Sequence, residues 1–153
     1  MLLNTDPPIT YLISEGILTS ANYNTKVNKV LDIAKIAVEE NISFIQIREK
    51  LLPTKLVYNL TCKVLEIASQ SKTKVLVNDR ADIVLAANAD GVHLTSDSIP
   101  TQVIRNSLPK DSIIGVSSIG GVLDCFTSSF GAAVSVFLGI FSAVAVGAGF
   151  LTA

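Results

Sequence analysis

Short apolar runs alternate along much of this chain with longer stretches in which apolar residues recur every three or four positions. The short runs are rich in branched residues and end at polar or turn residues, which predicts buried strands. The longer stretches predict amphipathic helices. The expected strands span residues 9–13, 42–47, 74–77, 91–94 and 113–116, and the expected helices span 25–40, 53–68, 81–88 and 100–107.

The order of these elements, strand then helix four times and then a fifth strand, predicts a parallel sheet with right-handed crossovers. Polar residues close three of the strands, in residues 46–50, 78–80 and 90–94. In an α/β barrel or a doubly wound sheet, chemistry takes place at the carboxyl ends of the strands. The polar residues therefore predict an active site at one edge of the sheet.

Composition and charge narrow the function classes. The chain has 153 residues and a net charge of -1, so it has neither the basic surface expected for nucleic acid nor an acidic tail. Cys62 and Cys125 lie too far apart for a metal motif or a disulfide framework, which favours a reducing compartment. Residues 1–10 lack the pattern of a signal peptide. We expect a cytoplasmic protein in which any binding is confined to a local site.

Gln46, Arg48 and Lys50 alternate along the second expected strand, so their side chains would point to the same side. Two cations beside an amide suit a phosphate-bearing ligand. Ile47 and Glu49 would then face the helices. The alternative is a charged strand end exposed to solvent.

Asn78 and Asp79 reach the same edge from the third strand. An aspartate there could bind Mg²⁺ that bridges a diphosphate. Alternatively, either residue could cap the helix that begins at Ala81. His93 has neither a second histidine nor a nucleophile beside it, so a structural role is favoured over a catalytic one.

Residues 46–50, 78–82, 89–94 and 114–117, taken in this order and spacing, resemble thiamine phosphate synthase and the related thiazole tautomerases. The resemblance covers about residues 9–118. It implies a (β/α)8 TIM barrel that condenses hydroxymethylpyrimidine diphosphate with thiazole phosphate, giving thiamine phosphate and diphosphate with the help of Mg²⁺. It also implies that Asp79 binds the metal, and that the pyrimidine substrate is bound by Gln46, Arg48, Lys50, Asn78 and Ser117.

One departure from the family concerns the metal site. The family's second metal-binding aspartate corresponds to Ser98, whose hydroxyl is a weaker ligand than a carboxylate. Because Ser98 precedes Pro100 by two residues, we favour a helix N-cap there, with Asp97 as a substitute carboxylate. Residues 94–98 also resemble the tautomerases, but the histidine expected in those relatives is replaced by Ile119. A thiazole tautomerase is therefore the second candidate.

A larger departure concerns the end of the chain. The residues after Ser117 are too few for three more strand and helix units, so we expect a barrel truncated to about five βα units. Residues 1–118 would form this partial barrel, and residues 119–153 an atypical apolar tail that is uncharged from Cys125 onward. A frameshifted or misjoined reading is the favoured explanation of the tail. The others are a membrane segment and an apolar cover for the open sheet edge. A non-catalytic remnant that binds the pyrimidine diphosphate, and self-association, also remain open.

Overall fold

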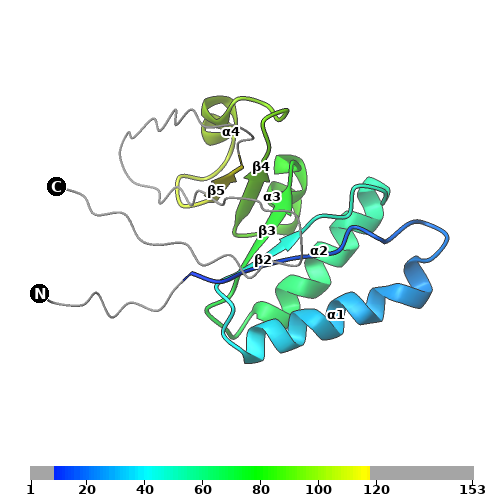
Figure 1. Cartoon of the computed structure of the whole chain (residues 1–153). Coiled ribbons are helices and arrows are strands. Elements are labelled where there is room, and N and C mark those ends of the chain that lie inside the picture. The colour runs from blue at the N-terminus through cyan, green and yellow to red at the C-terminus, as the bar shows by residue number, and fades with distance from the viewer. Residues whose placement is uncertain (1–8, 118–153) are drawn as a thin grey trace, which may run out of the picture.

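A computed structural model describes residues 9–117 as alternating strands and helices. The strands are β1 (Tyr11–Ile13), β2 (Phe44–Ile47), β3 (Lys74–Asn78), β4 (Gly91–Leu94) and β5 (Ile113–Val116). The helices are α1 (Tyr23–Glu39), α2 (Thr54–Ala68), α3 (Ala81–Ala87) and α4 (Thr101–Ser107) (Figure 1). The element types and their order are those predicted from the sequence.

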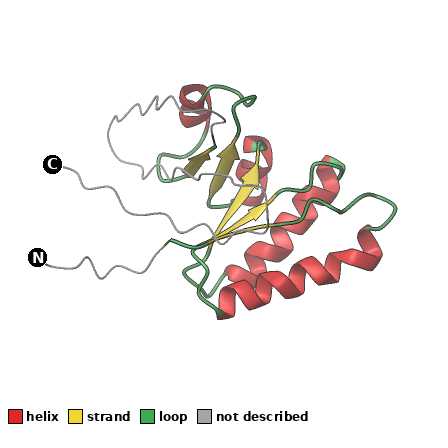
Figure 2. Cartoon of the chain, viewed as in Figure 1, coloured by secondary structure: helices red, strands yellow, loops and turns green. Residues whose placement is uncertain are grey.

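The strands form one parallel sheet whose order in space, β1-β2-β3-β4-β5, follows their order in the chain. A doubly wound sheet would reverse direction at a switch point. A sequential parallel order instead requires every right-handed crossover to turn the same way, as in an α/β barrel. Figure 2 shows the neighbouring strands with α1 and α2 alongside them. The barrel-type fold is confirmed, and the doubly wound alternative is wrong.

The main hydrophobic core lies between the helices and one face of the sheet. Alternate strand residues point to that face, among them Ile45, Ile47, Val75, Val77, Val92 and Ile114. They pack with the apolar stripes of the helices, which include Val27, Ala34, Leu60, Val64, Ile83 and Ile104. Because the strand periodicity is two, the residues between them belong to the opposite face.

That opposite face carries the polar strand residues. Gln46, Asn78 and His93 lie on it and are all buried, together with Tyr11 and Leu76. The register places Asn78 beside His93, and His93 beside Gly115. A side chain at position 115 would bring a Cβ atom within 2.8 Å of His93 Nδ1, so only glycine leaves room for the histidine ring. The polar groups therefore gather on the face turned away from the helices.

Several expectations fall on parts of the chain that the structure does not describe. The domain boundary at residue 118, Ile119, Cys125 and the explanations of the tail at 119–153 all lie outside the described residues. Between residues 9 and 117, no helix is both long and apolar enough to cross a membrane.

Candidate active site

Four polar side chains from three segments form a continuous series of hydrogen bonds at the carboxyl edge of the sheet. Gln46 Nε2 on β2 donates to Asn78 Oδ1 on β3 at 2.8 Å, and Asn78 Nδ2 donates to Asp79 Oδ2 at 2.7 Å. Ser98 Oγ, from the loop after β4, donates to the other carboxylate oxygen, Asp79 Oδ1. We refer to Gln46, Asn78, Asp79 and Ser98 as the polar chain. It joins segments that are far apart in the sequence at the edge where the sequence predicted a site.

The carboxylate of Asp79, which accepts hydrogen bonds from both Asn78 and Ser98, fixes the direction of the hydrogen bonds in the polar chain. An ionised aspartate only accepts hydrogen bonds, so Asn78 must turn its NH₂ group toward Asp79 and its carbonyl oxygen toward Gln46. Gln46 then donates to Asn78, and its own Oε1 has no hydrogen-bond partner in the described part of the chain. Gln46 is only 1% exposed, so this oxygen is a buried acceptor that a ligand could satisfy.

The backbone at Asp79 has a left-handed conformation, with φ of 55°. Such a conformation costs a residue with a side chain about 1–2 kcal/mol. A backbone hydrogen bond from Asp79 N–H to His93 O, at 2.9 Å, helps to hold it. Helix α3 has Arg80 as its N-cap and receives no side-chain capping bond there. The interpretation of Asn78 or Asp79 as a helix cap is therefore wrong.

Ser98 also does not cap a helix. The N-cap of α4 is Pro100, with no side-chain capping bond. Ser98 instead closes a tight turn with Thr95, because Thr95 N–H donates to Ser98 Oγ at 2.7 Å and Ser98 N–H donates to Thr95 O at 3.1 Å. This turn brings the Ser98 hydroxyl back to Asp79, so the favoured N-cap interpretation of Ser98 is wrong.

The cations expected at the edge follow β2 and do not lie within it, since β2 ends at Ile47. Arg48 is half-buried, and its backbone N–H donates to Ser14 Oγ at 2.9 Å. Lys50 is exposed in the next turn. Both therefore stand at the carboxyl end of the sheet, with Arg48 nearer to its interior.

Glu49 is buried between these cations but does not face the helices as the alternation predicted. Its carboxylate accepts hydrogen bonds from the backbone N–H groups of Gly16 at 3.2 Å and Leu18 at 2.9 Å. Glu49 thus holds the loop that connects β1 to α1. The alternation fails here because the chain has already left the strand.

His93 is buried on the face of the sheet turned away from the helices, the inner face, and contacts a residue that the sequence did not single out. Its Nδ1 is 3.2 Å from the hydroxyl oxygen of Tyr11, and burial raises the pKa of that hydroxyl. Burial lowers the pKa of His93, with a further lowering by the charge of Arg48 and an opposing effect of Asp79. His93 is therefore neutral near pH 7. The only sequence signal for Tyr11 was its position on the inward-facing side of the first strand.

The remaining candidates lie around the polar chain. Asp97 is exposed and does not take part in the polar chain. Ser117 follows β5, where its backbone N–H donates to Leu94 O at 2.9 Å. Arg80 pairs with Asp82 through contacts of 2.8 and 2.6 Å, and this bonding lowers the pKa of the Asp82 carboxyl.

The protein groups at this edge of the sheet could supply only part of the ligands of a metal ion. Within residues 9–117 no three histidine, cysteine or acidic side chains are grouped closely enough to hold a metal ion. Asp79 supplies one carboxylate of the kind that Mg²⁺ prefers, and Mg²⁺ commonly completes its shell with water and substrate phosphates. Asp79 therefore fits a Mg²⁺ ion that is shared with a phosphate-bearing ligand.

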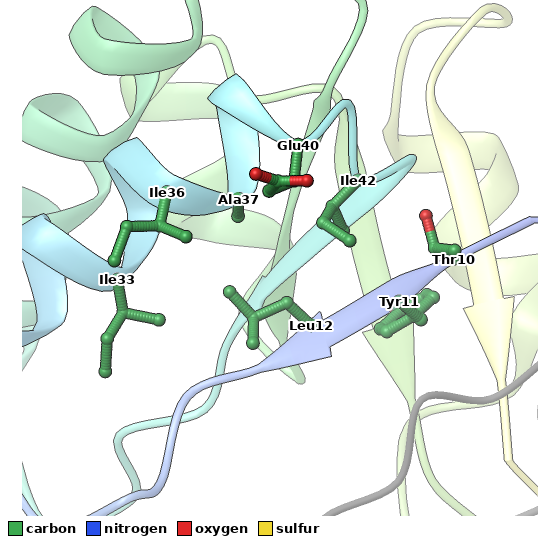
Figure 3. Close-up of a pocket in the computed structure, with 8 residues that line it drawn as sticks. All are labelled: Thr10, Tyr11, Leu12, Ile33, Ile36, Ala37, Glu40 and Ile42. Carbon is green, nitrogen blue, oxygen red and sulfur yellow. The ribbon is translucent and has the colours of Figure 1, made fainter.

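An apolar pocket at the other end of the sheet is not part of this site. It lies between β1 and α1, and its lining residues include Leu12, Ile33, Ile36 and Ile42 (Figure 3). Thr10, Tyr11 and Ile42 place it near the amino ends of β1 and β2. In α/β barrels the amino ends of the strands serve stability, whereas the carboxyl ends carry the chemistry.

Comparisons with known proteins agree with the fold. Residues 11–120 match the family described as thiamine monophosphate synthase. A thiamine-phosphate synthase from Methanobrevibacter smithii is 39% identical over 90 residues, which are 59% of this chain and 43% of that protein. One from Clostridium acetobutylicum is 40% identical over 96 residues, which are 61% of this chain and 46% of that protein.

A solved structure is also similar. A thiamine phosphate pyrophosphorylase from Pyrococcus furiosus superposes with a TM-score of 0.55 and 28% identity, covering 70% of this chain and 48% of that one. The present chain thus spans about half the length of the proteins it matches. The family match runs from the first residue of β1 to beyond the end of β5 and includes all four members of the polar chain. This chain belongs to the thiamine monophosphate synthase family.

Proposed function

We propose that this chain provides the pyrimidine diphosphate site of a thiamine phosphate synthase. Such an enzyme condenses hydroxymethylpyrimidine diphosphate with thiazole phosphate to give thiamine phosphate and diphosphate. The observation that carries the proposal is the polar chain, which places a buried amide acceptor and an aspartate at the same edge of the sheet as two cations. The names of the relatives support this choice.

The residues divide the substrate between them. Gln46 and Asn78 would bind the pyrimidine ring on the buried inner face, where Gln46 Oε1 can accept an N–H of the ligand. Arg48 and Lys50 would bind the diphosphate beyond the end of β2. Ser117 would contact the same substrate from the end of β5. The planar ring of the substrate would therefore lie in the buried interior, and its charged diphosphate would lie at the exposed edge of the sheet.

The reaction needs positioning and charge more than acid and base groups. Loss of diphosphate leaves a pyrimidine-methyl cation, and the thiazole nitrogen captures it. Arg48 and Lys50 would stabilise the leaving diphosphate, while the buried inner face keeps water away from the cation. Asp79 would hold Mg²⁺, which supplies further positive charge to the diphosphate when bound. We also propose that the protein is cytoplasmic.

A second candidate is a protein that binds the pyrimidine diphosphate without turnover. The buried acceptor Gln46 Oε1 favours it, because this oxygen offers a binding contact that requires no turnover. A thiazole tautomerase would instead act on a thiazole carboxylate phosphate with neither Mg²⁺ nor the pyrimidine substrate. It has less support, because the polar chain and its cations suit a diphosphate.

The 153-residue protein can be tested directly by calorimetry with the pyrimidine diphosphate and Mg²⁺, and by diphosphate release after thiazole phosphate is added. We expect binding, and an Asp79→Asn variant should lose about tenfold or more in affinity. Asp32→Asn is a matched control, because Asp32 is an exposed residue of α1 paired with Lys35. Binding without diphosphate release would favour the second candidate. Absence of binding would refute both, and turnover of the thiazole carboxylate phosphate would favour the tautomerase.

A further inference from the structure

We infer that Ser98 acts on the metal site as a neutral hydrogen-bond donor that positions Asp79, and not as a metal ligand. A divalent cation would then bind here only together with a diphosphate. This inference rests on the proposed function and adds to it the condition under which the cation binds. Three observations support it: the bonding of the Ser98 hydroxyl, the bonding of the Asp79 carboxylate, and the charges around them.

The bonding capacity of the Ser98 hydroxyl is already used. A serine hydroxyl has one hydrogen to donate and two lone pairs to accept with. The hydrogen is directed to Asp79 Oδ1. One lone pair accepts the N–H of Thr95 at 2.7 Å, and Thr95 Oγ1 lies 3.1 Å from the same oxygen. To bind a metal, Ser98 would have to give up part of the turn that holds it in place.

The carboxylate of Asp79 is held from both sides. Oδ1 accepts from Ser98, and Oδ2 accepts from Asn78 at 2.7 Å. These two donors fix the side chain above a backbone whose φ of 55° is unfavourable for aspartate. Loss of the Ser98 donor would leave the carboxylate oriented from one side only. Ser98 is therefore a positioning residue for Asp79.

The charge at the site is too small for a free cation. Asp79 is the one carboxylate in the polar chain, Asp97 is exposed outside it, and Asp82 is bonded to Arg80. Mg²⁺ gives up its water reluctantly and is usually bound by one or two carboxylates plus phosphate oxygens. A diphosphate would supply those oxygens, and Arg48 and Lys50 would hold it in place. Metal and diphosphate should consequently raise each other's affinity by the same factor.

Water proton relaxation with Mn²⁺ as the probe separates these possibilities without any turnover. Wild-type protein should bind Mn²⁺ at least about tenfold more weakly alone than with inorganic diphosphate, which lies within the usual range of coupling between sites. Ser98→Asp should raise the affinity for Mn²⁺ alone by about tenfold or more, because it places a second carboxylate beside Asp79. The gain with diphosphate present should be smaller.

Two further variants distinguish positioning from ligation. Ser98→Ala should leave the weak binding of Mn²⁺ alone within about twofold and should weaken the complex with diphosphate. Ser98→Thr keeps the hydroxyl and should restore it. Circular dichroism and urea denaturation confirm that each variant is folded, and if Ser98→Ala fails this check it is replaced by Ser98→Cys, which keeps the size but donates weakly.

The inference is overturned if wild-type protein binds Mn²⁺ alone as tightly as with diphosphate, or if it binds Mn²⁺ under neither condition. It is also overturned if Ser98→Ala abolishes the binding of Mn²⁺ alone, since Ser98 would then be a ligand. The proposed function has a separate test. If the pyrimidine diphosphate binds while Mn²⁺ alone binds tightly, the inference fails and the proposed function stands.

Discussion

Replacement of Asn78 by alanine would break the polar chain at its centre. Asn78 is 8% exposed and is hydrogen-bonded to both Gln46 and Asp79. Its loss would leave Gln46 Nε2 without its acceptor, on a side chain whose Oε1 already has no partner in the described part of the chain. A buried polar group that loses its partner costs about 1–3 kcal/mol, and Asp79 would also lose a donor. We expect Asn78→Ala to lower the free energy of unfolding by about 2–3 kcal/mol.

Urea denaturation of the 153-residue protein measures this loss. Asn106→Ala is the matched control, because Asn106 is exposed on α4 and accepts one bond from Gln102, at 3.2 Å. Its effect should stay within about 0.5 kcal/mol. A double-mutant cycle with Gln46→Leu and Asn78→Leu should give a coupling of about 1 kcal/mol, because with both side chains replaced neither amide is left without its partner. Equal losses at positions 78 and 106, or no coupling, would refute the reasoning.

Three other predictions concern stability. Burial lowers the pKa of His93, so in mildly acidic solution the unfolded chain binds a proton that the folded protein does not. The free energy of unfolding should therefore fall as the pH drops below about 6.5, by at most about 1.4 kcal/mol per pH unit. Urea midpoints at neutral and mildly acidic pH test this, and an unchanged slope in His93→Asn would contradict it. Gly91→Ala should lower the melting temperature more than Gly115→Ala, because its Cβ would lie 2.0 Å from the backbone oxygen of Ile113, whereas the Cβ at 115 meets a side chain. Equal melting temperatures would argue against this. Glu49→Gln should cost about 1–3 kcal/mol and speed proteolysis between β1 and α1, since an NH₂ group would replace one acceptor; unaltered cleavage would count against it.

The strands and helices could be predicted from the sequence because their signals are local. A strand such as Val75–Val77 is apolar throughout, since both faces of the sheet are buried there. The stripe on α2, with Val57, Leu60 and Val64, repeats at helical spacing and packs on the core. In each case the residues that reveal the element are those that stabilise it.

The predictions from the sequence were wrong where a residue's hydrogen-bond partner is distant in the sequence. Ser98 has the local context of a helix cap, but its partner is Asp79 in the preceding strand and helix unit. In the sequence, Glu49 continues the alternation of the strand and was expected to face the helices. However, β2 ends at Ile47, and Glu49 instead accepts hydrogen bonds from Gly16 and Leu18. No pattern in the neighbouring residues could indicate either contact.

The direction of the polar chain has a consequence for molecular recognition. The hydrogens that Gln46 and Asn78 donate within the polar chain both point toward Asp79, because its negatively charged carboxylate only accepts hydrogen bonds. The negative charge of Asp79 thereby determines which atom of Gln46 is free to contact a ligand in the buried interior, and that atom is the oxygen Oε1. A positively charged residue at position 79 would favour turning both amides around, so that the interior offered N–H groups and selected ligands of opposite hydrogen-bonding polarity.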